Sequence, residues 1–420
     1  MGTAFSAADI LLPANTDMEK WAVAACDQYT GEPEYWARVE KRVENSPSTL
    51  GLILPEVYLE ETDVDARIDR IHENMKKMLA DGIFREYKDA LIYVERVQSD
   101  GMVRKGIVGA IDLEQYDYHA GSDSSVRATE ATVPERIPPR LKVREGAVIE
   151  LPHVLILIDD EDMTVIEPCE RVKTDTKPIY ETKLMEGGGR IKGWLLDHPA
   201  KKSVFGALEK LSDNEAFNKK YGLNKFPTLL FAVGDGNHSL ATAKEYYERL
   251  KAANPGQDFS NHPARYALAE IVNLHSPAIR FEAIQRIVKG VDPEKLMEAA
   301  KKKLGLGSEL SNQRFIAVYG GKEQLFYIHD KTSELSVGTL QDFLDDYTSE
   351  NGGKVDYIHG ADVVRHLAKR DNVIGFILPD MQKSELFPTV IKDGALPRKT
   401  FSMGHAADKR FYMECRKITR

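Results

Sequence analysis

The order of apolar and polar positions predicts a helix and a hairpin in the first quarter of the chain. Between residues 63 and 80, apolar side chains recur at spacings of three and four, as on one face of a helix. Gly82 follows and is expected to end that helix. Residues 90–98 and 102–111 are rich in β-branched side chains and flank a Ser-Asp-Gly sequence at 99–101, so they predict a β-hairpin.

Strands and helices are expected to alternate through the rest of the chain. Residues 153–158 and 163–166 predict a second hairpin around an acidic sequence. The apolar run 226–233 has the length of a strand, and apolar residues at helical spacing follow it between 240 and 250. The remainder predicts strands at 264–274, 313–319, 324–329 and 373–378 and a short helix at 362–370. This interleaving favours a mixed α/β protein.

Length, charge and cysteine content narrow the class of protein. A chain of 420 residues exceeds one ordinary core, so we expect two or three lobes. The expected ranges are 1–150, 151–300 and 301–420, and packing of these ranges as one unit stays open. The net charge of −9, without a cluster of Lys, Arg and aromatic residues, argues against a nucleic-acid partner. Three scattered cysteines without a CxxC pair argue against a thiolate zinc site and fit a reducing cytosol. Because no apolar run reaches about 18 residues and no signal peptide is evident, we expect a cytoplasmic protein without a membrane partner.

The strongest local signal for chemistry is the turn Gly234-Asp235-Gly236-Asn237-His238-Ser239, which follows the strand at 226–233. Glycine permits a positive φ and lets a ligand approach the backbone closely. The N-terminus of the following helix favours an anion such as phosphate. Asp235 could hold Mg²⁺ or accept a hydroxyl proton, and His238 could orient a ligand by hydrogen bonding. The turn therefore predicts an enzyme site for a small phosphorylated ligand.

A structural interpretation of the same turn stays open. Asp235 or Asn237 could cap the helix, with His238 as a satisfied polar residue. The pattern also approaches a dinucleotide fingerprint, but its third glycine is missing. A P-loop, an HExxH zinc motif and a GxSxG nucleophile elbow are all absent from the sequence.

Sequence blocks spread over most of the chain resemble the bacterial family of domain of unknown function 1015. These blocks are GDGNHSLATAK at 234–244, HPARYALAEIVNLH at 262–275, MEGGGRIKGW at 185–194, VDYIHG at 355–360 and LPRKTFSMG at 396–404. Their distribution indicates similarity to a full-length member of that family.

The turn itself resembles the Asp-Gly-x-His-Arg signature of the ParB/sulfiredoxin-like superfamily, which includes nucleotide-dependent enzymes and free serine kinases. Asp235, Gly236 and His238 match the signature, but Ser239 stands where the superfamily has a phosphate-binding arginine. The resemblance therefore implies that a basic residue from elsewhere must replace it. The candidates are Arg127, Arg190, Lys192 and Lys399.

Four further residues are candidates for the site. Glu130 follows Arg127 in a block that resembles the family and could provide a second carboxylate, although a surface glutamate explains it equally well. Lys399 lies in a loop rich in hydrogen-bond donors and is expected to contact the ligand. The family resemblance makes Asp27 and Tyr29 candidate pocket residues. The triple glycine at 187–189 could wrap an anion, or it could be a flexible turn.

Together these features predict a ParB/sulfiredoxin-like unit with family-specific elaborations. The expected activity is Mg²⁺-dependent phosphoryl transfer between ATP or ADP and a small hydroxyl metabolite, with free serine or phosphoserine as the best candidate. In this hypothesis Asp235 is the metal ligand or base, and the backbone amides of residues 236–239 hold phosphate, together with Gly234. Two alternatives stay open: a phosphatase of the same substrate, and a non-catalytic regulator that binds a nucleotide or metabolite.

Overall fold

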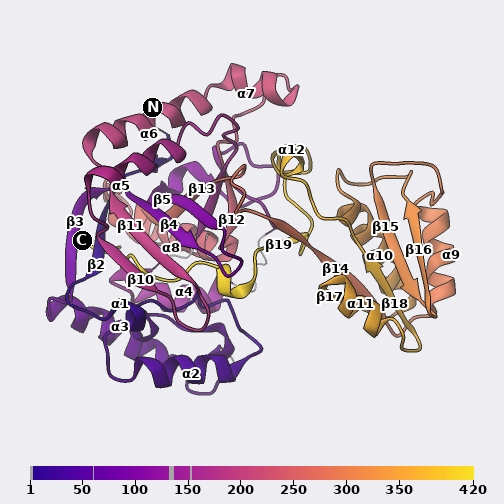
Figure 1. Ribbon diagram of the computed structural model, residues 1–420, viewed down its shortest axis with the longest axis horizontal. Helices are drawn as coiled ribbons and strands as arrows, with labels where there is room; N and C mark the ends of the chain where they lie inside the picture. The colour runs from indigo at the N-terminus through magenta and orange to yellow at the C-terminus, as the bar shows by residue number, and fades with distance from the viewer. Residues whose placement is uncertain (1–2, 60, 132–136, 152–153) are drawn as a thin grey trace. The chain divides into compact units, whose positions relative to one another are not determined.

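The computed structural model describes residues 3–59, 61–131, 137–151 and 154–420 (Figure 1). The chain divides into two compact units, Met1–Ile279 with Gly404–Arg420, and Arg280–Met403. The first unit contains parts of all three ranges expected from the sequence, and those boundaries stay a prediction. Helices and strands alternate in both units, so the mixed α/β class is confirmed.

The helices of the first unit lie around a large sheet. They are α1 (Met18–Trp21), α2 (Pro33–Val43), α3 (Val64–Ala80), α4 (Ile137–Glu145), α5 (Val172–Asp175), α6 (His198–Leu211), α7 (Asn214–Tyr221) and α8 (Asn237–Ala253). Helix α4 packs against both α8 and α3. Among the described residues, no helix combines the length and the apolar character needed to cross a bilayer.

The main sheet of the first unit has the strand order β10-β11-β4-β5-β13-β9-β12-β7-β6, and β1 also pairs with β5. Its strands are β1 (Phe5–Ser6), β4 (Ile92–Val97), β5 (Val103–Asp112), β6 (Tyr116–Asp117), β7 (Val126–Ala128), β9 (Leu155–Ile158), β10 (Tyr180–Lys183), β11 (Arg190–Leu195), β12 (Phe231–Asp235) and β13 (Tyr266–Asn273). Two smaller ladders pair β2 (Ala8–Pro13) with β3 (Phe84–Ala90) and β8 (Ile149–Glu150) with β20 (Arg416–Lys417).

The C-terminal residues return to the first unit and lie beside its N-terminal strands (Figure 1). Leu11 and Cys415 form an antiparallel bridge, with N···O distances of 2.8 and 2.9 Å. The indole nitrogen of Trp21, a fully buried side chain, donates to the carbonyl of Met413 at 3.0 Å. The core of this unit is therefore built from both ends of the chain.

The first helix and hairpin expected from the sequence are confirmed. Helix α3 buries Ile68, Ile71 and Met75 on one face, and Gly82 follows it with a φ of 67°. This left-handed conformation explains why glycine ends the helix. Strands β4 and β5 pair in antiparallel register and join through Gly101, which has a φ of 82°.

The second hairpin expected from the sequence is wrong. Strand β9 pairs with β12 on one side and with β13 on the other, so neither of its edges is free to pair with residues 163–166. They form an irregular turn instead, because the carboxylate of Asp160 accepts hydrogen bonds from the amides of Thr164 and Val165 at 2.7 and 2.8 Å. His153, where that hairpin was expected to begin, lies outside the described residues.

The second unit is a smaller α/β structure with the strand order β16-β15-β18-β14-β17, and β19 also pairs with β14. Its elements are β14 (Phe281–Lys289), α9 (Pro293–Lys303), β15 (Arg314–Tyr319), β16 (Lys322–Tyr327), α10 (Ser336–Asn351), β17 (Lys354–His359), α11 (Ala361–Leu367), β18 (Val373–Ile377), α12 (Lys383–Asp393) and β19 (Phe401–Met403). The strands and the short helix that the sequence predicts between residues 313 and 378 are confirmed.

Candidate functional site

The turn 234–239 joins β12 to α8, as the sequence predicts. Gly234 lies where the register of β12 against β9 shifts, so it occupies a β-bulge. Gly236 has a φ of 80° and occupies the N-cap position of α8. A side chain at this φ would be strained, which explains the second glycine. Both glycines thus shape the backbone on either side of Asp235.

Asn237 fixes the turn to Thr129, the residue directly after the neighbouring strand β7. Its Oδ1 accepts from the amide of Thr129 at 3.1 Å, and its Nδ2 donates to the Thr129 hydroxyl at 3.4 Å. The same hydroxyl donates to the carbonyl of Val233 at 2.5 Å. Asn237 and Thr129 are both buried. The Asn237 side chain is therefore part of the scaffold, while its backbone amide stays at the start of α8.

Asp235 lies next to a lysine that the sequence analysis missed. Its Oδ1 accepts from the Gly236 amide at 3.0 Å, and its Oδ2 lies 3.3 Å from Nζ of Lys409. The two side chains are 19% and 11% exposed, respectively, so the pair is shielded but still reached by solvent. Both residues belong to the first compact unit.

Buried arginines hold the backbone that precedes Lys409. Nη2 of Arg96 donates to the carbonyl of Ala407 at 2.7 Å, and Nη1 of Arg104 donates to the carbonyl of Asp408 at 3.0 Å. The Asp408 carboxylate accepts from the amide and the hydroxyl of Ser99 at 2.6 and 2.8 Å. The short 3₁₀ turn Ala406–Asp408 is therefore fixed on the tip of the β4–β5 hairpin.

A second group of buried charges holds the residue after Lys409. Arg410 donates to Glu270 at 2.8 Å and to Glu414 at 2.5 Å, and Arg104 lies 3.3 Å from Glu270. Burial by itself would raise the pKa of Glu270, but Arg104 and Arg410 hold that pKa below its usual range. Burial, followed by the neighbouring charge of Arg104, lowers the pKa of Arg96 to about 9.

The N-terminal candidates Asp27 and Tyr29 follow a segment that runs antiparallel to residues 410–412. The amide of Ala25 donates to the carbonyl of Arg410 at 3.0 Å, and the amide of Cys26 donates to the Tyr412 hydroxyl at 3.1 Å. The structure therefore brings the start of this candidate segment next to the residues that follow Lys409. The Tyr29 ring stacks on the ring of Tyr35, with centroids 3.6 Å apart.

The remaining sequence candidates, Arg127 on β7 and Glu130 shortly after it, differ in their surroundings. Arg127 is buried, and its guanidinium donates to the carbonyls of Ser124 at 2.7 Å and Pro227 at 2.9 Å. Both carbonyls lie before β7 and β12 begin, whereas Asp235 ends β12. These contacts give no support to Arg127 as a phosphate ligand at the turn, and that role stays a prediction. Glu130 is half-buried directly after Thr129, which contacts Asn237.

The other basic candidates lie elsewhere in the chain. Lys399 belongs to the second compact unit, where its carbonyl accepts from Arg286 at 2.9 Å. Arg190 and Lys192 both lie on β11 and pair with Glu181 on the neighbouring strand β10, at 3.7 and 2.8 Å. The triple glycine that precedes them lies in the turn between β10 and β11, and this turn is enough to explain the three glycines without an anion.

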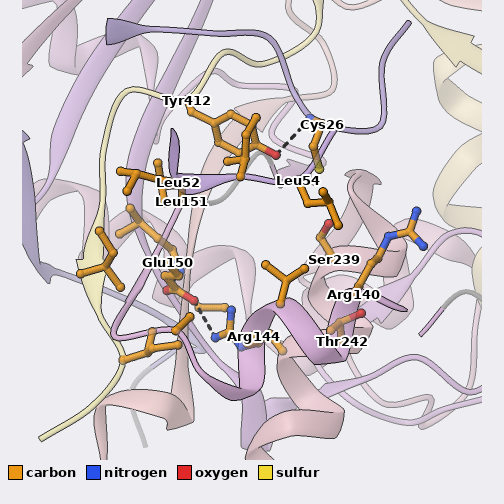
Figure 2. A pocket seen from close by; sticks show the side chains of 18 of the residues that line it. Cys26, Leu52, Leu54, Arg140, Arg144, Glu150, Leu151, Ser239, Thr242 and Tyr412 are labelled. Atoms are coloured by element: carbon orange, nitrogen blue, oxygen red, sulfur yellow. Dashed lines mark hydrogen bonds and ion pairs between the residues drawn. The ribbon is translucent and has the colours of Figure 1, made fainter. Parts of the chain in front are cut away.

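A pocket of about 150 Å³ lies along the first turns of α8 (Figure 2). Its lining includes Ser239 and Thr242 from α8, Cys26 and Tyr412 from the two chain ends, and aliphatic side chains such as Leu54. Cys26, Tyr412 and Ser239 are each within three residues of Asp27, Lys409 or the turn. Two of the lining segments, the start of α8 and residues 409–412, therefore also carry the residues at Asp235.

The charged residues of the pocket wall are already paired. Arg144 donates to Glu150 at 2.6 Å, and Arg140 forms an ion pair with Glu56. In Figure 2 the guanidinium of Arg140 points away from the aliphatic side chains. The pocket thus offers mainly apolar surface, which suits the apolar part of a ligand.

A cluster of possible metal ligands lies at the other end of the sheet. Asp159, Glu161 and His275 place ligand atoms within 4.8 Å of one another. The ammonium group of Lys220 lies 2.9 Å from Asp159 and 3.2 Å from Glu161. Asp235 pairs with Leu155, the first residue of β9, whereas Asp159 directly follows the last residue of β9. The cluster and the turn therefore lie at opposite ends of this strand.

Several solved structures show a distant similarity to this chain. A free serine kinase in complex with AMP has 13% identity and a TM-score of 0.38, covering 74% of this chain and 92% of that chain. A conserved hypothetical protein from Pyrococcus furiosus has 11% identity and a TM-score of 0.36, covering 74% and 95%. SbnI with C-terminal truncation, from Staphylococcus aureus, has 11% identity and a TM-score of 0.35, covering 71% and 83%. Similarity at this level carries no information about function.

The search among curated proteins finds no match. The family described as protein of unknown function (DUF1015) matches residues 9–347, which include most of the sequence blocks that predicted it. The chain therefore belongs to the DUF1015 family.

Proposed function

We propose that the first unit catalyses phosphoryl transfer between a nucleotide and a small hydroxyl metabolite at the turn around Asp235. One observation carries this proposal: the Asp235 carboxylate lies between two glycines at the N-terminus of α8, 3.3 Å from the ammonium group of Lys409. A purely structural cap needs no such lysine. A carboxylate, a cation and a helix N-terminus together suit a phosphate ester and the hydroxyl group that attacks it.

The proposed reaction uses Asp235 as the base. The substrate hydroxyl attacks the terminal phosphorus of ATP, a new O–P bond forms, and the bond to the β-phosphate oxygen breaks to release ADP. Asp235 accepts the proton that the hydroxyl loses. The first turn of α8 directs backbone N–H groups toward the phosphate, and His238 orients it. Catalysis would come from positioning and charge stabilisation.

The residues at the turn fit a magnesium ion that arrives with the nucleotide. Mg²⁺ commonly binds one or two protein carboxylates together with substrate phosphates. Asp235 would provide one carboxylate, and Glu130, next to Thr129, is the candidate for another. The ion would neutralise charge on the transferred phosphoryl group.

The choice of serine rests on the resemblance of Asp235, Gly236 and His238 to the superfamily signature. The test incubates the protein and Mg²⁺ with serine plus ATP, and separately with phosphoserine plus ADP, and follows phosphate transfer by ³¹P NMR. Phosphoserine without nucleotide is the control for a phosphatase. Transfer in either nucleotide-containing sample supports the proposal.

The other outcomes separate the alternatives. Free phosphate in the control sample alone would identify a hydrolase. No reaction in any sample, with the protein folded, would exclude serine as the substrate. Binding of ADP without turnover of any tested hydroxyl compound would favour a regulator.

A further inference from the structure

We infer that Lys409 binds the phosphate of the ligand and replaces the arginine that the Asp-Gly-x-His-Arg signature has after its histidine. This inference rests on the proposed function and deepens it, because it assigns the missing positive charge to a residue. Ser239 occupies the arginine position and carries no charge. In the structure the C-terminal segment brings an ammonium group to the turn instead, through the contact of Lys409 with Asp235.

The donor capacity of Lys409 exceeds its observed pairing. An ammonium group carries three N–H donors. Within the described part of the chain, Asp235 is the one acidic group that pairs with Lys409, at 3.3 Å. The side chain is only 11% exposed, so water has limited access to the other donors. A phosphate at the start of α8 would provide the acceptors that those donors need.

Buried hydrogen bonds and ion pairs hold the backbone on both sides of Lys409. A surface lysine that only neutralises a nearby carboxylate would not need them. Arg96 and Arg104 hold the two carbonyls before it, and Ser99 holds the Asp408 carboxylate. On its other side, Arg410 is buried in ion pairs with two glutamates. Buried charges are costly unless they are fully paired. The chain thus places a set of buried charges around a segment whose one ammonium group faces Asp235.

Arg96 has donors to spare in this arrangement. It is 1% exposed, and its Nε and Nη1 have no hydrogen-bond partner. Its guanidinium lies over the ring of Phe411, 4.9 Å from the centroid. An arginine that serves only the stability of the core would leave fewer donors unsatisfied.

The test measures binding of Mg·ADP by calorimetry to the full chain and to matched lysine variants. Lys409→Met should weaken binding about 10- to 150-fold, as expected for the loss of a charge-assisted hydrogen bond. Lys409→Arg keeps the charge and should restore most of the affinity, which a merely structural role would not require. Lys201→Met is the matched control, because Lys201 is 15% exposed and also pairs with an aspartate, Asp89, and the affinity of this variant should equal that of the wild type. Lys399→Met tests the competing basic candidate from the sequence.

Circular dichroism confirms that each variant is folded, and Lys409→Gln replaces Lys409→Met if the latter is not. Equal affinity of the folded wild type and the neutral variant overturns the assignment of Lys409. A loss of affinity with Lys399→Met, but not with the Lys409 variants, also overturns it. If the wild type itself binds no Mg·ADP, the proposed function is refuted. This outcome is distinct from the two results that overturn the assignment of Lys409 alone.

Discussion

Removing the negative charge of Glu270 should destabilise the first unit strongly. Glu270 is fully buried and pairs with Arg104 and Arg410, at 3.3 and 2.8 Å. In Glu270→Gln, Arg410 keeps Glu414 as a partner at 2.5 Å. Arg104 keeps the carbonyl of Asp408 as an acceptor but loses its negatively charged partner, because Glu270 is its one acidic partner among the described residues. One buried guanidinium thus loses its counter-ion.

Breaking a buried ion pair from one side typically costs about 3–5 kcal/mol. At an unfolding entropy of about 2.1 cal/mol/K per residue, a unit of about 300 residues would lose about 5–8 °C in melting temperature. Calorimetry at neutral pH measures the change directly. Glu181→Gln is the matched control, because Glu181 is 40% exposed in its pair with Lys192, and its melting temperature should stay close to that of the wild type.

The pH dependence gives this prediction a second test. The folded-state pKa of Glu270 is lowered, so its ionised form stabilises the protein above the unfolded pKa of about 4.5. That contribution is lost as the pH falls through the lower, folded pKa. The gap in melting temperature between wild type and Glu270→Gln should therefore narrow below about pH 4.5. A variant that melts with the wild type at neutral pH would refute the reasoning about the buried charges.

Three further predictions concern the turn and its supports. Asp235→Asn should abolish phosphate transfer in the ³¹P assay with a melting temperature within a few degrees of wild type; retained activity would make the turn structural. Thr129→Val should cost about 1–3 kcal/mol in a urea titration, because it removes the hydroxyl that accepts from Nδ2 of the buried Asn237. Gly189→Ala should destabilise the protein more than Gly187→Ala. Both have φ near 75°, but only at Gly189 would a Cβ lie 2.1 Å from the carbonyl oxygen of Val97; equal losses would contradict the close contact.

The periodicity of apolar residues predicted those helices and strands that bury a single apolar face. The spacing of Ile68, Ile71 and Met75 predicts α3, because one apolar stripe is buried. The run 163–166 looked like a strand for the same kind of reason, but no edge of β9 was free to pair with it. Pairing partners are distant in sequence, and no local pattern contains them.

The sequence predicted the part of the candidate site that depends on neighbouring residues, and it did not predict the part that depends on a distant contact. The glycines on either side of Asp235 marked the turn, because their backbone requirements are local. Lys409 gave no comparable signal, because its role depends on a contact with a residue far away in the sequence. The one available hint was the charged sequence Asp-Lys-Arg at 408–410, placed directly before the apolar residues 411–413. Charge inside an apolar segment often indicates buried pairing.

The division of the first unit around an inserted second unit has a consequence for the order of folding during synthesis. Ribosomes make Glu270 and the strand that carries it before any of residues 404–420 exist. Until those residues emerge, Glu270 lacks Arg410, and the carbonyl partner of Trp21 is missing. We expect the nascent first unit to stay incompletely packed, and to become able to hold Asp235 against its lysine only after the second unit has been synthesised.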